Sequence, residues 1–281
     1  MNKASYCLAI AIAGAVAISS CGTNNTAETY STANVAAVDT TPVDEKASYE
    51  FSYTIANIPP PLMVLDEYAK ANIPADGSLI NSTDNIDNYK TAGSQALNFG
   101  IFGVDLGYLV VNGRNTDALK YFNTTRTLAQ NLGLGATFDQ FAESFQRNAE
   151  NRDSIMRITD MAYAATDKYL RSNERLATAS QILVGSWIEG QHITLNSLKN
   201  QERTAAIESL YQRVWEQRLH LENIVKTTSE FSSDKDLAGL NKELAELLEL
   251  YKKPADAKSI TKEMLTEMAA KVSSIRNSIT K

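Results

Sequence analysis

The chain has 281 residues with 27 basic and 33 acidic side chains, which gives a net charge of −6 at pH 7. Basic residues are interspersed with acidic ones and form no block, so the composition argues against a nucleic-acid partner. The two cysteines are Cys7 and Cys21. The remainder of the chain therefore has no thiol for a disulfide, a cysteine metal site or a cysteine nucleophile.

The first twenty residues have the build of a secretory signal. Lys3 precedes an apolar stretch from Cys7 to Ile18, which is too short to be trusted as a membrane span. The run Ile18–Cys21 then matches a bacterial lipobox, in which the cysteine becomes the first mature residue and is acylated. The alternative is an ordinary signal with an incidental cysteine, but no A-x-A pattern competes with this site. We therefore expect residues 1–20 to be a lipoprotein signal peptide and Cys21 to be the lipid attachment site.

Acylation of Cys21 predicts a membrane partner and a location in the cell envelope. Acyl chains contribute roughly 0.8 kcal/mol per buried CH₂, so two or three of them hold a protein on a bilayer nearly permanently. We expect the outer membrane of a Gram-negative bacterium, on its periplasmic or its surface face. Removing the signal leaves 26 basic and 33 acidic residues, a net charge of −7.

Residues 21–48 are rich in Thr, Ala and Asn and poor in large apolar side chains. Such a segment cannot bury enough surface to offset its ordering entropy, so we expect a flexible tether. Pro59, Pro60 and Pro61 then favour an extended entry to a short helix that begins near Leu62 and ends before Pro74.

Helical periodicity dominates the sequence after residue 86 and predicts one all-helical domain over residues 49–281. Asn173, Asp234, Ser259 and Thr261 are suited to cap helix starts. We find no convincing strand, and the fold class expected is all-α, an antiparallel multi-helix bundle with short connections. The helices expected are Asp87–Val111, Thr116–Leu132, Thr137–Asn148, Asp153–Leu170, Asn173–Leu198, Gln201–Thr228, Asp234–Lys252 and Ser259–Ile279.

A single stretch around Gly113 resembles one tetratricopeptide unit. It reads LGYLVVNGRNTDALKYF and places Ala118 and an aromatic at Tyr121 or Phe122 after the turn glycine. A solenoid needs at least about three such units at a fixed period, and no second one is found. An isolated helical hairpin is therefore favoured over a repeat array.

Three glycines fall within the apolar run NFGIFGVDLGY of residues 98–108. Gly100, Gly103 and Gly107 lie on one face of a helix at 100° per residue. They match neither G-x-G-x-x-G nor a phosphate loop, and the run is short and contains Asp105, which argues against a membrane span. We expect this face to let a neighbouring backbone or a bulky aromatic lie directly against the helix.

Asn98, Asp105 and Asn112 form a polar line on the other side of the same helix. One interpretation is a solvent strip or a satisfied internal network, with Asp105 paired to a basic side chain such as Arg114 or Arg126. The other is the border of a ligand groove, where a carboxylate would orient a polar substrate.

Residues 184–192 read VGSWIEGQH, in which Glu189 and His192 have the E-x-x-H spacing of di-metal bundles. Such a centre needs a second E-x-x-H, and the other histidine, His220, follows Glu216 by four positions. We therefore expect no metal site and no cofactor, and interpret Glu189 and His192 as an intrahelical pair or a buried hydrogen-bonded couple. The two glycines of this segment are expected to allow close helix packing, with the tryptophan in the core.

No residue set indicates nucleophilic catalysis. There is no G-x-S-x-G motif and no persuasive Ser/His/Asp set, and two tryptophans are few for a carbohydrate-cleaving site. The candidates for a ligand site or a polar network, shared between two glycine-bearing helices, are Asn98, Asp105, Tyr108, Trp187, Glu189 and His192.

These motifs together resemble those of a family of helical, signal-bearing lipoproteins of the Bacteroidetes. The resemblance spans roughly residues 55 to 195 and rests on matches at Ile58–Pro61, then Asn85, Tyr89, Thr91, Ala96 and Asn98, then Gly100, Asp105, Leu106 and Tyr108, and finally Gly185 and Trp187–Gly190. It implies a cell-envelope location and an all-helical domain, and it implies no reaction.

The sequence thus predicts a lipid-anchored binding or scaffolding module with a protein or small-molecule partner, and favours no enzyme activity. Two alternatives stay open. One is a small-molecule or metal-dependent enzyme in which Glu189 and His192 act at a site in the bundle core. The other is a tetratricopeptide-like peptide-binding protein.

Overall fold

The computed structural model describes residues 68, 70, 71 and 73–281. The predicted signal peptide, the lipid attachment site at Cys21, the tether and most of the short helix near Leu62 lie outside these residues. The described part is all-helical and contains no strand. This agrees with the fold class that periodicity predicts.

The elements follow one another through short connections. Their bounds are η1 (Thr83–Asn88), α3 (Ala92–Val111), α4 (Asn115–Asn131), α5 (Gly135–Asp139), α6 (Ala142–Arg147), α7 (Arg152–Ser172), α8 (Leu176–Leu198), η2 (Ala205–Ile207), α9 (Glu208–Ser229), α10 (Lys235–Lys252), η3 (Ala257–Ser259) and α11 (Lys262–Ile279).

Most boundaries agree with the sequence, with three exceptions. The helix expected from Gln201 begins at Glu208 as α9, after the short η2. Helix α3 begins at Ala92 rather than Asp87, because Thr91 and Ser94 form a reciprocal capping box there. The helix expected over Thr137–Asn148 is two short helices, α5 and α6.

Two of the four expected caps are confirmed. Asp234 accepts from the first-turn amides of α10, and Thr261 does so for α11. The cap expected at Asn173 is wrong: this residue ends α7, and Glu174 turns the chain at φ 56° before α8 begins. Ser259 instead closes a capping box with Asp256 in η3.

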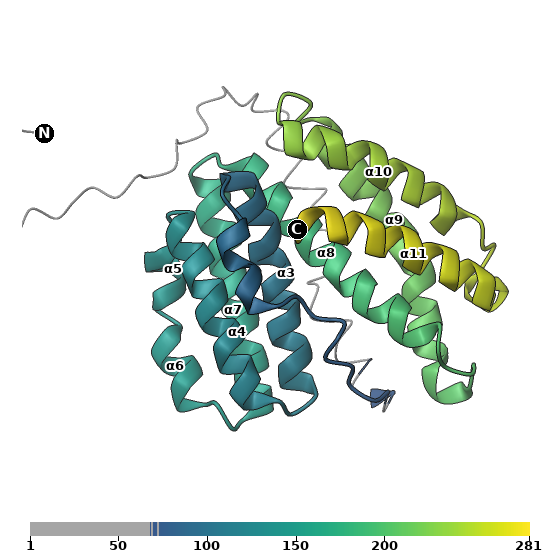
Figure 1. The fold of residues 1–281 in the computed structure, drawn as a ribbon, viewed down its shortest axis with the longest axis horizontal. Helices are drawn as coiled ribbons and strands as arrows, with labels where there is room; N and C mark the ends of the chain where they lie inside the picture. Colours follow the sequence, from purple (N-terminus) through teal and green to yellow (C-terminus); the bar gives the residue numbers. More distant parts are fainter. Residues whose placement is uncertain (1–67, 69, 72) are drawn as a thin grey trace, which may run out of the picture. The chain divides into compact units, whose positions relative to one another are not determined.

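Helices α3 and α8 form the centre of the body. They pack against each other, and each contributes to both hydrophobic clusters of the core. Helices α4, α5 and α7 contact one another or α3 on one side, and α9, α10 and α11 contact one another or α8 on the other (Figure 1). The body is thus two groups of helices joined through one central pair.

The central pair crosses at Gly100 and Gly185. A Cβ on Gly185 would overlap the carbonyl of Leu97, and a Cβ on Gly100 would overlap the carbonyl of Ile182. Gly185 faces Leu97, three positions before Gly100, and Gly100 faces Ile182, three positions before Gly185. The two sides of the crossing are therefore locally equivalent. The close backbone approach that the glycine face predicts is confirmed at this point.

Gly103 and Gly190 behave differently from the glycines at the crossing. Gly103 faces the hydroxyl end of the Tyr163 ring, and this hydroxyl donates to the carbonyl of Phe99 at 2.9 Å. This is the aromatic contact that the sequence predicts. The close packing expected at Gly190 is wrong, because a Cβ there would meet no atom of the described residues within 4 Å.

Helix α3 is the one helix of the described residues that is long and apolar enough to cross a membrane. It is 83% buried within the body over the apolar window. Its neighbours are other helices of the same chain, as in the core helix of a globular domain.

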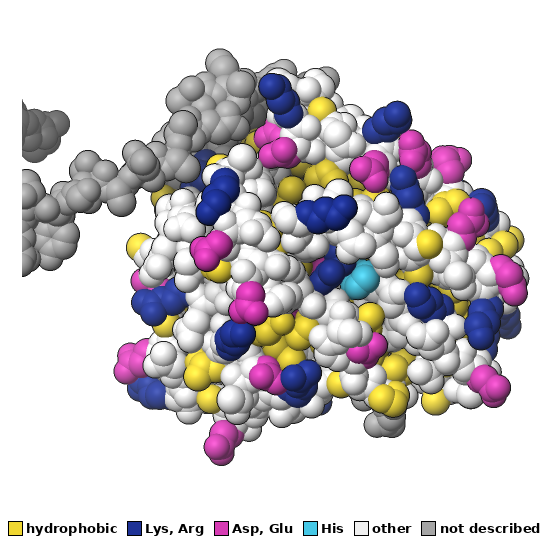
Figure 2. All heavy atoms as spheres, viewed as in Figure 1, with side chains coloured by type: hydrophobic (Ala, Val, Ile, Leu, Met, Phe, Trp, Pro, Cys, Tyr) yellow, Lys and Arg dark blue, Asp and Glu magenta, His cyan; other side chains and the backbone are white. Residues whose placement is uncertain are grey.

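The surface carries charge of both signs. On the face shown in Figure 2, basic and acidic side chains are interspersed, and hydrophobic atoms occur in small patches between them. Several charges pair within one helix, such as Arg147 with Glu143 at 2.7 Å.

Candidate functional site

The charged side chains of the two central helices define the candidate site. In α3 the ionisable side chains are Asp105 and Tyr108, and in α8 they are Glu189 and His192. Asp105 and Glu189 are therefore the only acids of these two helices. Both are 0% exposed. Asp105 follows Gly100 by five positions and Glu189 follows Gly185 by four, so each acid lies about one turn beyond the crossing. The helix crossing therefore brings two carboxyl groups together in the core.

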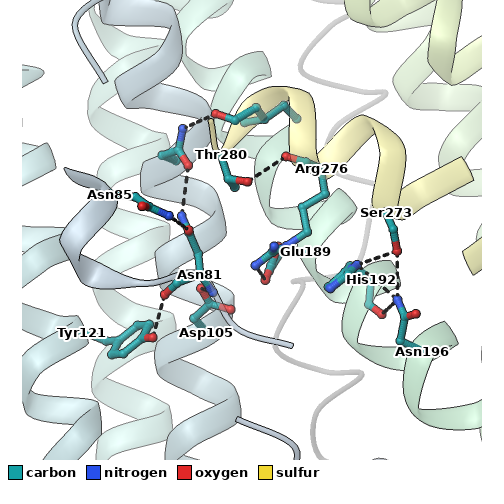
Figure 3. A network of polar contacts seen from close by, with 12 residues as sticks. Asn81, Asn85, Asp105, Tyr121, Glu189, His192, Asn196, Ser273, Arg276 and Thr280 are labelled. Atoms are coloured by element: carbon teal, nitrogen blue, oxygen red, sulfur yellow. Dashed lines mark hydrogen bonds and ion pairs between the residues drawn. The ribbon is translucent and has the colours of Figure 1, made fainter. Parts of the chain in front are cut away.

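Arg276 of α11 neutralises one of these carboxyl groups. Its Nε donates to Glu189 Oε2 at 2.6 Å and its Nη2 donates to Oε1 at 2.8 Å. Such a two-point contact is the strongest geometry available to an arginine and a carboxylate. Arg276 is itself only 8% exposed, so the pair is shielded from solvent and from salt. Figure 3 shows Arg276 reaching from α11 toward Glu189.

Asp105 has no arginine of its own. Its Oδ2 accepts from the backbone N–H of Asn81 at 3.0 Å, whereas no N–H or O–H group of the described residues donates to its Oδ1. Its carboxyl group lies close enough to Glu189 for the two charges to interact. Burial, and next the negative charge of Glu189, raise the pKa of Asp105 well above its usual range. A proton on Asp105 would let its unpartnered oxygen donate to Glu189.

Asn81 ties the segment before η1 to this cluster (Figure 3). Besides its N–H, its carbonyl accepts from the hydroxyl of Tyr121 at 2.6 Å, and its amide donates to the hydroxyl of Tyr89 at 2.8 Å. The same amide lies 3.4 Å from Oδ1 of Asn98. Every polar group of the Asn81 backbone that faces the core thus has a partner.

Asn98 connects α3 to the end of α11. Its amide donates to the carbonyl of Ile279 at 3.0 Å and to the carbonyl of Ser94 at 2.9 Å. The carbonyls of the last helical turn have no partner within the helix, so this contact satisfies one of them. The network therefore joins α3, α8 and the last turn of α11.

His192 lies beside the cluster but bonds elsewhere. Its Nδ1 is 3.1 Å from the hydroxyl of Ser273 in α11 and 3.2 Å from the amide of Asn196. Burial lowers the pKa of His192 to about 4, so the ring is neutral at ordinary pH. Glu189 pairs with Arg276 instead, so the interpretation of Glu189 and His192 as a bonded couple is wrong.

The two remaining candidates lie at separate positions. Tyr108 accepts from the backbone N–H of Asp76 at 2.9 Å and lies 3.3 Å from the hydroxyl of Tyr68. Trp187 is in the core, as expected, and its Nε1 donates to Gln217 of α9 at 2.8 Å. Of the six sequence candidates, the structure brings Asn98, Asp105 and Glu189 into one network, with His192 at its edge.

The basic partners expected for Asp105 are wrong. Arg114 pairs with Asp117 at 2.6 Å, and Arg126 pairs with Asp139. Both contacts are partly exposed and use residues other than Asp105. The polar line on α3 is an internal network at Asn98 and Asp105, in which Oδ1 of Asp105 lacks a donor among the described residues, whereas Asn112 caps the helix end.

Sequence reasoning missed Arg276 and Asn81. Arg276 had a readable signal, because it occupies the buried stripe of α11 beside Val272, Ile275 and Ile279. A charge at a core position requires a buried partner. Asn81 had no such signal, since it stands in a polar stretch that resembles any loop.

The arrangement favours a structural over a chemical role for these carboxyl groups. Both oxygens of Glu189 are bound to Arg276, and this contact fastens α11 to α8. Comparison with protein-family models, with curated proteins and with solved structures finds no match to the chain. The resemblance to Bacteroidetes lipoproteins stays a prediction from sequence.

Proposed function

We propose that the chain is a lipid-anchored protein of the cell envelope whose helical body acts as a binding or scaffolding module. The observation that carries the proposal is the lipobox at Ile18–Cys21, which follows a signal-like apolar stretch and precedes a tether-like segment. Acyl chains on Cys21 would hold the body at the outer membrane.

The contacts of the body support a module without catalysis. Glu189, His192 and Asn98 use their polar atoms on Arg276, Ser273 and Ile279. Groups that already bind one another inside the core are not available to a substrate. The surface, with its interspersed charges, is the part of the body left for a partner (Figure 2).

Acylation is tested by replacing each cysteine in turn in the full chain. Cys21→Ser is expected to abolish incorporation of a labelled palmitate and to move the protein from the membrane to the soluble fraction, because the acyl chains supply the attachment. Cys7→Ser is the matched control and should keep both properties, since Cys7 leaves with the signal. Retention of label and membrane association in Cys21→Ser would reject the anchor.

The rival enzyme with a bundle-core metal is tested by metal analysis of the purified chain. We expect no stoichiometric iron, manganese or zinc, because Glu189 is held by Arg276 and His192 by Ser273. A stoichiometric metal that is lost in His192→Ala and kept in His220→Ala would establish the rival and overturn the proposed module.

A further inference from the structure

Asp105 is a carboxylic acid at a position where an asparagine would make the same contacts. An amide could accept from the N–H of Asn81 through its oxygen and donate to Glu189 through its nitrogen. The acid can do both only while it carries a proton. With an aspartate at this position, the contact to Glu189 depends on pH, whereas an asparagine would make the same contact at every pH.

The charges around the pair make ionisation of Asp105 unfavourable. With Asp105 charged, two carboxylates would face one cation, Arg276, at a site where all three side chains are buried. The other titratable groups that surround the cluster are neutral at ordinary pH: Tyr89 before α3, Tyr121 of α4, Tyr163 of α7 and His192 of α8. None of them supplies a second positive charge.

Helix α11 is the element that closes the cluster. Arg276 and the carbonyl of Ile279 are its contacts to Glu189 and to Asn98, and both lie within its last turn. Undocking of this turn would break both contacts and admit water to Asp105 and Glu189. Water would then stabilise the ionised form of Asp105, so its proton would leave to solvent.

We propose that the Asp105–Glu189 pair holds one proton while the end of α11 is docked and releases it when α11 undocks, so that pH sets the docking of α11. A rise in pH then favours the undocked form. The direction follows from linkage, because the docked state binds one more proton than the undocked state. This device does not depend on lipid attachment at Cys21.

Hydrogen exchange of the full chain over a range of about pH 5 to about pH 9 tests the proposal, with the amides of α7 as the reference within the same molecule. After correction for intrinsic exchange rates, the opening of residues 272–280 relative to α7 should rise by up to about tenfold per pH unit in the wild type. Asp105→Asn should remove this slope, because its amide donates to Glu189 at every pH.

Two further variants make the result decisive. Asp117→Asn, the same change at the partly exposed pair with Arg114, should keep the wild-type slope. Glu189→Gln should remove it even if Asp105→Asn does not fold, because Asp105 is then the one carboxylate of the cluster and Arg276 balances its charge. An equal slope in the wild type, Asp105→Asn and Glu189→Gln, or no slope in the wild type, overturns the proposal.

Discussion

Gly185→Ala is expected to lower the free energy of unfolding by about 3 kcal/mol, because the added methyl group overlaps the carbonyl of Leu97. That carbonyl belongs to the backbone of α3 and cannot rotate away as a side chain would. Separating the helices would also loosen the contacts of Asp105 and Glu189, which lie about one turn beyond the crossing. Chemical denaturation with an unchanged m-value measures the loss.

Gly190→Ala is the matched control in the same helix. A Cβ there meets no atom of the described residues within 4 Å, so alanine should raise the free energy of unfolding by about 0.5–1 kcal/mol through its better helix propensity. Opposite signs for the two variants are the expected result. Similar shifts in the same direction would show that the crossing at Gly185 is not tight.

The sequence predicts this part of the fold because glycine spacing has a simple geometric meaning. Gly100, Gly103 and Gly185 stand at helical positions where nothing but close approach explains the loss of helix propensity. Gly190 is also a helical glycine, but no neighbouring backbone among the described residues packs against it. The sequence does not show which helix lies opposite a given glycine. The turns between helices are less predictable from sequence than the helix crossing. The start of α8, for example, depends on a single positive φ angle at Glu174.

Arg276→Met is expected to lower the free energy of unfolding by about 3–5 kcal/mol, because it leaves Glu189 buried without a positive partner. Methionine keeps most of the length and apolar volume of the arginine, so the loss reports the charge rather than a cavity. Thermal or denaturant unfolding at neutral pH measures it.

Arg147→Met is the control at a surface pair. Arg147 and Glu143 are 2.7 Å apart, but their side chains are 67% and 77% exposed. Water and salt screen such a pair, so the change should cost less than about 1 kcal/mol. A cost at Arg276 no larger than the cost at Arg147 would contradict the buried cluster.

The site was harder to predict than the fold, because its partners are distant in sequence. Asp105 and Glu189 stand out as lone acids in apolar helices, and the sequence marks them correctly as a pair of interest. Glu189 and Arg276, however, are 87 positions apart. Arg114 and Arg126, the basic partners expected for Asp105, lie nearer to it in the sequence than Arg276 does. The packing of α11 on α8 brings Arg276 to the cluster instead.

The central claim is that Asp105, Glu189 and Arg276 form one buried charge cluster that fastens α11 to the crossing of α3 and α8. A double-mutant cycle on Glu189→Met and Arg276→Met tests it most directly. We predict that the double variant is more stable than the sum of the single losses implies, with a coupling energy of about 2 kcal/mol or more. Losses that add to within about 0.5 kcal/mol would contradict the account, because uncoupled side chains do not form a cluster.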